Sequence, residues 1–259
     1  MTSATLSVVG LQVRFGGLVA NDDISLSLPA QSIGAVVGPN GAGKTTLFNA
    51  ITGAIRPTSG RVMLGERDIT STSPAGRARL GIARTFQNLS LVEDLSAVDN
   101  VTVGLGRFRH TGLLQAMLAS PLSLRTDRNI RACARRALDF VGLADAADRP
   151  TGALSYGDRR RVEIARAIAL APLLLLLDEP SAGMGPAETD ELASLFFAAR
   201  EEIGCSILVV EHDMSMVRAV AEFTTVLEQG RVISEGTTAT VLADPAVAAA
   251  YLGSAHQNA

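Results

Sequence analysis

Residues 38–45 read GPNGAGKT, a full match to the pattern G-x-x-x-x-G-K-S/T. The apolar run IGAVV at 33–37 precedes the match, and the helix-compatible run TTLFNAI at 45–51 follows it. A buried strand, a glycine-rich turn and a helix in this order are the context in which the pattern binds phosphate. The stretch therefore predicts an α/β fold with a phosphate loop.

The residue types within this loop indicate its chemistry. Glycines let backbone N–H groups turn inward around phosphate oxygens, and the helix N-terminus adds a favourable dipole. Lys44 would supply a mobile charge for the β- and γ-phosphates, and Thr45 a hydroxyl for Mg²⁺. A glycine-rich turn that binds nothing is the alternative, but such a turn rarely needs this lysine. The predicted ATP-binding residues are Gly38, Pro39, Asn40, Gly41, Ala42, Gly43, Lys44, Thr45 and Thr46.

A second apolar run, LLLLLDE at 173–179, ends in two carboxylates. Parallel sheets bind ligands at the carboxyl ends of their strands, so both acids should face the phosphate loop. Asp178 is placed to hold Mg²⁺, directly or through water, and Glu179 to polarise the water that attacks the γ-phosphate. A solvated strand end is the alternative for an isolated Asp-Glu pair, and the phosphate loop favours catalysis.

The rest of the chain alternates between strand and helix patterns. Strand patterns fill much of 6–37 and return after 173, where a helical stretch between apolar runs indicates a parallel sheet. Helical periodicity replaces them in the middle, with apolar residues at Ile130, Ala134, Ala137, Leu138 and Val141. We expect one domain over 1–259, with a helical subdomain inserted at 89–153 and a C-terminal helical tail at 237–259.

Composition excludes several other classes of protein. The 259 residues are 47% hydrophobic, yet no run reaches the roughly 20 apolar residues of a membrane span. The start, MTSATLSVVG, lacks the features of a secretory signal, so we expect the chain in the cytoplasm. A formal net charge of -3 argues against a nucleic-acid partner. Cys133 and Cys205 have no nearby His, and they indicate neither a disulfide scaffold nor a zinc site.

The segment before the acidic strand narrows the choice among kinases, GTPases, helicases and ABC ATPases. Residues 154–158, LSYGD, resemble the ABC signature motif, whose commonest form is LSGGQ. The resemblance implies that two cassettes pack head to tail, and that Ser155 and Gly157 of one contact the γ-phosphate held by the other. The residues agree, because Ser155 is a good N-cap and the following helix would point its positive end at an anion. A cap and a turn alone are the alternative.

Three further residues match positions of the same family. Phe15, at the end of LQVRF, matches the aromatic that stacks on adenine, with a core aromatic as the alternative. Gln87, in ARTFQN, matches the glutamine that touches Mg²⁺ or the water, although a lone Gln is usually a surface residue. His212, after ILVVE, matches the switch histidine that hydrogen-bonds the γ-phosphate, with a structural histidine as the alternative. The resemblance thus implies the catalytic residues Glu179, His212 and Gln87, and the metal ligands Thr45, Gln87 and Asp178.

Longer stretches are similar to the LivG type of subunit from branched-chain amino acid importers, namely RFGG, ARTFQNLSLV, LSYG, DEPSAGMGP, EHDM and DPAVAAAYLG. The resemblance implies a P-loop NTPase fold with a mixed central sheet, an N-terminal antiparallel β-subdomain and an inserted helical subdomain. It also implies an ATP- and Mg²⁺-dependent ATPase, peripheral on the cytoplasmic face of the inner (plasma) membrane. ATP-driven closure of a cassette pair would be coupled to alternating access.

The implied assembly has several other members. A second, LivF-like ATPase or a second copy of this chain would complete a head-to-tail dimer. Two integral-membrane permease subunits would carry the solute, and an extracytoplasmic solute-binding protein would act indirectly. The ATPase would energise uptake of branched-chain or related amino acids without touching them.

Three residues depart from the commonest family pattern. Tyr156 stands in place of the first Gly of the signature LSGGQ, and Asp158 in place of its Gln. Gly185 stands where the D-loop of the family commonly has an Asp after AGL. Asp158 adds a negative charge near a phosphate site and bears on the contact between cassettes, while Gly185 bears on communication between the two ATP sites.

Other functions within and beyond transport stay open at this point. An exporter of the lipopolysaccharide type shares several motifs, and another small solute such as urea would suit the same ATPase. Chromosome-associated relatives need a long coiled coil, and the middle segment lacks sustained heptads. Ribosome-associated relatives usually carry two cassettes in one chain. A kinase or GTPase would leave the signature, Gln87 and His212 unexplained.

Overall fold

A computed structural model describes residues 6–85, 90–106 and 121–255, except for the side chains of 121–127 and 252–255. The chain divides into two compact units. The sheet unit comprises Met1–Arg84 and Leu173–Ala259, and the helical unit comprises Thr85–Pro172. The subdomain boundaries predicted from the sequence, 89–153 and 237–259, stay predictions.

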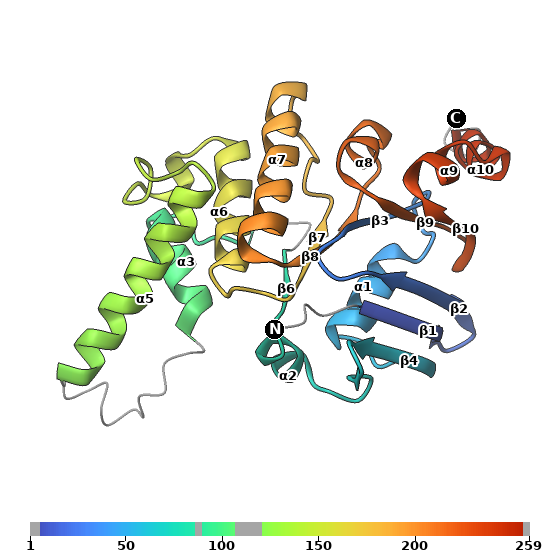
Figure 1. Ribbon diagram of the computed structural model, residues 1–259, viewed down its shortest axis with the longest axis horizontal. Helices are drawn as coiled ribbons and strands as arrows, with labels where there is room; N and C mark the ends of the chain where they lie inside the picture. The colour runs from blue at the N-terminus through green and yellow to red at the C-terminus, as the bar shows by residue number, and fades with distance from the viewer. Residues whose placement is uncertain (1–5, 86–89, 107–120, 256–259) are drawn as a thin grey trace. The chain divides into compact units, whose positions relative to one another are not determined.

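A six-stranded sheet forms the centre of the sheet unit, in the order β10-β9-β3-β8-β7-β6 (Figure 1). Five strands run parallel and β10 pairs antiparallel with β9, so the sheet is mixed as predicted. Every residue of β3, β7 and β8 is buried, as expected of strands covered on both faces. The strands are β3 (Ile33–Val37), β6 (Ile82–Arg84), β7 (Leu174–Asp178), β8 (Ser206–Val210), β9 (Phe223–Glu228) and β10 (Arg231–Thr237).

A four-stranded antiparallel sheet, in the order β2-β1-β4-β5, belongs to the same unit. Its strands are β1 (Leu6–Phe15), β2 (Leu18–Leu28), β4 (Ser59–Leu64) and β5 (Arg67–Asp68). Buried apolar residues of this sheet form one core with Leu47 and Phe48 of helix α1 (Lys44–Thr52). The predicted antiparallel β-subdomain is confirmed.

The C-terminal end of α1 is closed by a buried cation rather than by solvent. Arg77, on α2 (Pro74–Arg79), donates hydrogen bonds of 2.5 and 2.6 Å to the carbonyls of Ala50 and Ile51. It also donates to the carbonyls of Thr70 and Thr72. A guanidinium has five donors and a positive charge, which suits the unpaired carbonyls of a helix end.

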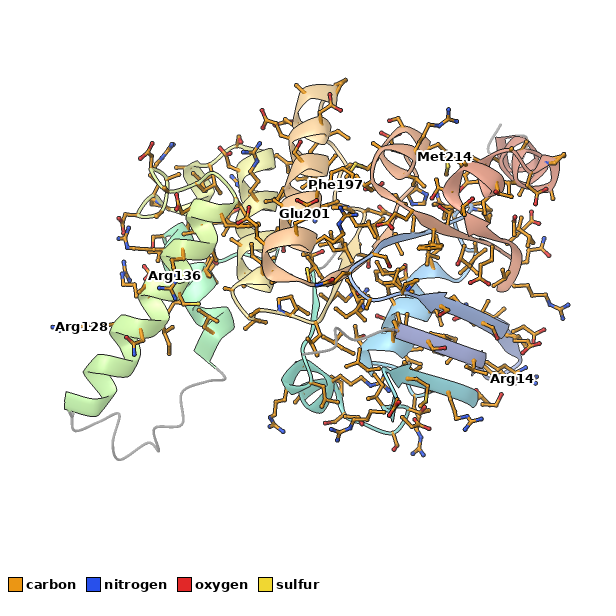
Figure 2. All side chains as sticks on the ribbon, viewed as in Figure 1. Arg14, Arg128, Arg136, Phe197, Glu201 and Met214 are labelled. Carbon is orange, nitrogen blue, oxygen red and sulfur yellow. The ribbon has the colours of Figure 1, made fainter. Side chains whose placement is uncertain are left out.

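The remaining elements of the sheet unit are helical. They are α7 (Pro186–Ala198), the π-helical turn η3 (Ala199–Ile203), α8 (Met214–Val220), α9 (Thr238–Leu242) and α10 (Pro245–Ala255). Figure 2 labels Phe197 and Glu201 on this α7–η3 segment and Met214 at the start of α8. The Arg200 guanidinium lies 5.4 Å from the centre of the Phe197 ring.

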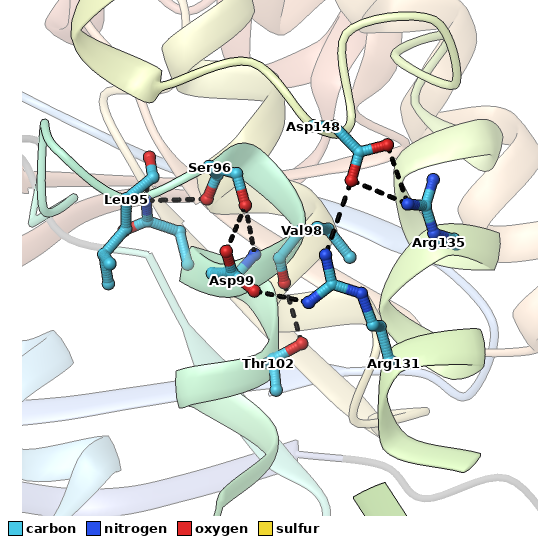
Figure 3. Close-up of polar contacts among 9 residues, drawn as sticks. Leu95, Ser96, Val98, Asp99, Thr102, Arg131, Arg135 and Asp148 are labelled. Carbon is cyan, nitrogen blue, oxygen red and sulfur yellow. Dashed lines mark hydrogen bonds and ion pairs between the residues drawn. The ribbon is translucent and has the colours of Figure 1, made fainter. Parts of the chain in front are cut away.

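Three helices pack on one another in the helical unit: α3 (Ala97–Leu105), α5 (Pro121–Phe140) and α6 (Tyr156–Ile168), with a short turn η2 (Thr151–Ala153) before α6. The apolar positions that the sequence assigned to one helical face are all buried, from Ile130 to Val141. On the outside, Arg131 bridges Asp99 and Asp148, and Arg135 holds both oxygens of Asp148 (Figure 3). Arg128 points away from α5 into solvent (Figure 2).

Within the described residues, we find no helix with the length and apolar character needed to cross a bilayer.

Candidate functional site

The predicted phosphate loop connects β3 to α1 in the sheet unit. Gly38 has φ 149° and a Cβ there would lie 2.1 Å from the Leu227 carbonyl oxygen. Gly43 has φ 99° and a Cβ there would lie 2.5 Å from both the Ala20 carbonyl oxygen and the Asn21 amide. Only glycine fits these two positions, because a side chain there would collide with neighbouring protein atoms and the backbone has positive φ.

Lys44 is buried at the start of α1 and turned back onto the loop. Its Nζ donates to the carbonyl oxygens of Gly38 at 2.6 Å and Pro39 at 2.9 Å. Burial lowers the pKa of the Lys44 ammonium, and the nearby carboxylates of Glu179 and Asp178 oppose that change. Lys44 is also the only lysine among 23 basic Lys and Arg residues, a signal in the composition that sequence analysis overlooked.

Asp178 ends β7 as a buried carboxylate with a cationic partner. The Arg84 guanidinium donates to its Oδ2 at 2.7 Å, and the two side chains are only 10% and 3% exposed. Arg84 also donates to Asn49 Oδ1 at 2.6 Å and lies 5.7 Å from the centre of the Phe48 ring. Neither Arg84 nor Asn49 was predicted from the sequence, although Arg84 lies within the ARTFQN stretch.

Glu179 and His212 lie together at the carboxyl edge of the sheet, as the sequence predicted. Asp178 pairs in register with Val210, so the residues after β7 and β8 emerge side by side. His212 Nε2 and Glu179 Oε1 are 2.6 Å apart. Glu179 has φ 47°, a left-handed backbone that non-glycine residues seldom adopt outside functional sites and tight turns.

A buried acid that the sequence analysis missed, Glu211, joins the two segments. It accepts hydrogen bonds from the backbone N–H groups of Ser181 at 3.0 Å and His212 at 3.1 Å. Burial raises the pKa of the Glu211 carboxyl, and these hydrogen bonds work against the rise. The side chain therefore fixes the backbone after Glu179 relative to the backbone at His212.

Two aromatic residues of the sheet unit bear on the site. Phe15 is 50% exposed at the end of β1, so it is not a core aromatic. Its neighbour Arg14 points away from the sheet (Figure 2). Burial raises the pKa of Tyr251 on α10 to about 12, while a hydrogen bond with the Gly38 backbone opposes the rise. No local pattern in the sequence connects this tyrosine with the phosphate loop.

The signature residues lie in the helical unit, at the start of α6. Ser155 is the N-cap of this helix, and its hydroxyl accepts the Asp158 N–H at 3.1 Å. Gly157 is buried in the first turn, and Tyr156 is 44% exposed. The Arg160 guanidinium lies 5.6 Å from the Tyr156 ring and donates to its hydroxyl.

Gln87 lies outside the described residues, but the chain that follows it is anchored to α6. The Ser90 N–H donates to Glu163 at 2.9 Å, and Arg166 donates to the Ser90 carbonyl at 2.7 Å. Glu163 is buried and pairs with Arg160 at 3.2 Å. Burial raises the pKa of its carboxyl, and the Ser90 hydrogen bond and the two arginines oppose the rise. Ser90 is thus tied to the signature helix.

The donor atoms around the loop suit a magnesium–nucleotide complex. Among the residues that the structure describes, no group of three or more His, Cys, Asp or Glu could hold a metal ion alone. Mg²⁺ in phosphate-binding proteins is held by one or two protein oxygens, water and the phosphates themselves. The exposed Thr45 hydroxyl on α1 and the Asp178 carboxylate are oxygen donors of that type.

Comparison with known protein families gives two matches. Residues 21–182 match the sequence model of the ABC transporter family. Residues 231–257 match that of the branched-chain amino acid ATP-binding cassette transporter. The second match includes β10, α9 and Tyr251.

Several curated relatives are similar along nearly the whole chain. The high-affinity branched-chain amino acid transport ATP-binding protein BraF of Pseudomonas aeruginosa is 39% identical over 98% of this chain and 100% of its own. LivG of Escherichia coli K12, with the same functional description, gives the same identity and coverage. A phosphonates import ATP-binding protein of Rhodopseudomonas palustris is 38% identical over 93% of this chain and 82% of its own.

Solved structures agree with the fold. A nucleotide-free ATP-binding cassette from an ABC transporter superposes with a TM-score of 0.85 at 29% identity, covering 96% of this chain and 98% of that one. A cassette in its ADP conformation gives a TM-score of 0.82 at 29% identity, covering 96% and 99%. The predicted fold class is confirmed.

Proposed function

The chain belongs to the ABC transporter family, and from this premise we propose that it binds and hydrolyses ATP to energise uptake of branched-chain amino acids. The observation that carries the proposal is the meeting of Lys44, Asp178 and the Glu179–His212 pair at one edge of the parallel sheet. Such a cluster of a phosphate-binding cation, a metal-binding acid and a base–histidine pair suits hydrolysis of a nucleoside triphosphate.

Nucleotide binding uses the loop and its lysine. The loop's inward backbone N–H groups and the start of α1 receive the phosphates, and Lys44 exchanges its two loop carbonyls for phosphate oxygens. Phe15, half exposed at the end of β1, offers a face for the adenine ring. Mg²⁺, when bound, neutralises developing phosphate charge, and Thr45 and Asp178 are the residues that would hold it.

Hydrolysis depends on Glu179 and His212. Glu179 takes the role of the group that orients and polarises the attacking water, within reach of the γ-phosphate held by Lys44. His212, hydrogen-bonded to Glu179 at 2.6 Å, holds that carboxylate and contacts the γ-phosphate. Glu211 keeps the two backbone segments in register through Ser181 and His212. Gln87 is the remaining proposed catalytic and metal-contacting residue.

A second cassette completes each site. Ser155 and the first turn of α6 form a helix N-terminus with an exposed tyrosine beside it, which is a surface suited to an anion. We assign Ser155 and Gly157 to the γ-phosphate bound by a partner cassette, either a related ATPase or a second copy. Activity therefore depends on that partner.

The proposed location is the cytoplasmic face of the inner membrane, where two permease subunits provide the transport path. An extracytoplasmic solute-binding protein would deliver the amino acid. The similarity to BraF and LivG over 98% of this chain supports branched-chain amino acids as the cargo. The phosphonate relative is a reason to test other small solutes as well.

Purification of the chain from native membranes with its partners tests the proposal. We expect a related ATPase, two permeases and a solute-binding protein, and we expect uptake of leucine, isoleucine and valine to need this chain. Recovery of a periplasmic bridge in place of a solute-binding protein would support an exporter. Unchanged uptake of all three amino acids after deletion would refute import of these solutes.

A further inference from the structure

Arg84 is a largely buried arginine that none of the proposed roles uses. It ends β6, and its side chain is 10% exposed. One nitrogen donates to Asp178 Oδ2 at 2.7 Å and another to Asn49 Oδ1 at 2.6 Å, while the guanidinium lies 5.7 Å from the Phe48 ring centre. All four residues belong to the sheet unit.

These contacts connect two parts of the nucleotide site. Phe48 and Asn49 lie on α1, the helix that begins at the phosphate loop, and Asp178 is the last residue of β7. The guanidinium is thus held at three points and in turn holds the carboxylate at a defined place relative to the loop. A planar fork with five fixed donors can make this bridge, whereas a lysine ammonium offers a single charged point.

The hydrogen bond from Arg84 occupies only part of the accepting capacity of the Asp178 carboxylate. An ionised carboxylate has about four lone-pair sites, so Asp178 can accept from Arg84 and still coordinate a cation or accept a hydrogen bond from the cation's bound water. Partners that hold metal-binding carboxylates by hydrogen bonds set the orientation of those ligands, and changing them typically lowers metal affinity about 10- to 100-fold.

We propose that Arg84 is a positioning residue for the divalent cation, acting by fixing the Asp178 carboxylate relative to the phosphate-loop helix. This inference rests on the proposed function, because it assigns Mg²⁺ to Asp178. Arg84 itself touches neither nucleotide nor metal in this account. Asn49 is the second anchor of the same bridge.

The test measures binding of fluorescent mant-ATP to the purified full-length chain, first with EDTA and then at graded Mg²⁺. For Arg84→Ala we expect unchanged affinity in EDTA and a half-saturating Mg²⁺ concentration raised about 10-fold. The half-saturating Mg²⁺ concentration of Arg84→Lys should lie between those of the wild type and Arg84→Ala. Asn49→Ala should give a smaller rise, because the bond to Asp178 remains.

A variant of Asp178 tests whether Arg84 acts through that acid. In an Asp178→Asn background, Arg84→Ala should produce no further rise in the half-saturating Mg²⁺ concentration, since the carboxylate is already gone. A further rise would contradict the proposal. If Arg84→Ala does not fold, as judged by thermal unfolding, Arg84→Lys and Asn49→Ala carry the test.

Three results would overturn the inference: an equal loss of affinity with and without Mg²⁺, an unchanged Mg²⁺ requirement, or a lowered one. The last would mean that Arg84 competes with the cation for Asp178. Failure of the proposed function looks different, because the wild-type chain would then bind mant-ATP with no dependence on Mg²⁺, or not bind it.

Discussion

Two arginine–aspartate clusters in this chain have nearly the same shortest nitrogen–oxygen distance and very different surroundings. At the carboxyl edge of the sheet, Arg84 holds Asp178 at 2.7 Å with side chains 10% and 3% exposed. In the helical unit, Arg135 holds Asp148 at 2.6 Å with side chains 46% and 64% exposed (Figure 3). Distance alone does not separate the two pairs, and burial does.

The difference decides what each cluster can do. Water and salt screen the exposed pair, so its ion pair contributes little to the free energy of unfolding. The buried pair lies where charges interact strongly and an unpaired charge is costly, so its geometry is fixed. The Arg84–Asp178 pair is therefore held in place at the edge where Lys44 and Glu179 lie, whereas the Arg135–Asp148 pair stays exposed to water.

Glu179→Gln should have the largest effect, at the buried edge. Steady-state ATP hydrolysis should fall by about 10² to 10⁴, because Glu179 is the group that we propose polarises the attacking water. ATP binding should remain, since the loop and Lys44 are unchanged. Glu201→Gln on exposed η3 is the matched control and should keep full turnover. Wild-type turnover in Glu179→Gln would remove Glu179 from the mechanism.

Arg77→Ala should come next, and it extends the comparison to a buried arginine that binds carbonyls. Four carbonyl oxygens would lose a charged donor, and we expect a loss of about 3 kcal/mol in the free energy of unfolding. Urea denaturation measures this loss. Arg79→Ala, on the exposed side of the same helix, should change it little. Equal losses for both variants would show that burial does not determine how much each arginine contributes to the free energy of unfolding.

Lys44→Ala should weaken ATP binding through loss of one charge-assisted hydrogen bond, about 1.5 to 3 kcal/mol, or about 10- to 150-fold in Kd. Calorimetric titration measures the change. Because Lys44 is the only lysine, ATP should also protect the wild-type chain from amine-reactive labelling at every site except the N-terminus. Labelling of Lys44 at the same rate with and without ATP would argue against its contact with phosphate.

Arg135→Ala should have the smallest effect, at the exposed cluster. Its loss should lower the melting temperature slightly at low salt and leave it unchanged at high salt, because screening already weakens the pair. Thermal unfolding at two salt concentrations measures both. A large decrease in melting temperature that persists at high salt would contradict the view that exposure to water makes the Arg135–Asp148 pair weak.

The sequence predicted the parts of the site that a local pattern encodes. GPNGAGKT predicted the loop between β3 and α1. The run LLLLLDE predicted that Asp178 and Glu179 lie at the same sheet edge as His212, because neighbouring parallel strands end at one edge. The strands β9 and β10 were not predicted, because residues 223–237 show no strong alternation of apolar and polar side chains. Element type followed from periodicity, and the predicted fold class was confirmed.

Contacts between distant segments could not be predicted in this way. Arg84 meets Asp178 across 94 positions, and Glu211 meets Ser181 across 30, so neither pair leaves a local signature. An arginine at the end of a short strand and a glutamate before a histidine both look like surface residues in the sequence. Only the register of β6, β7 and β8 brings them to the same edge.

The decisive measurement is leucine uptake by cells that carry Glu179→Gln in place of the wild-type chain. We expect uptake to fall to the level of a deletion strain while the purified variant still binds ATP, and we expect the wild-type chain to restore uptake. Uptake at the wild-type rate in Glu179→Gln cells would contradict the claim that hydrolysis at this sheet edge drives transport.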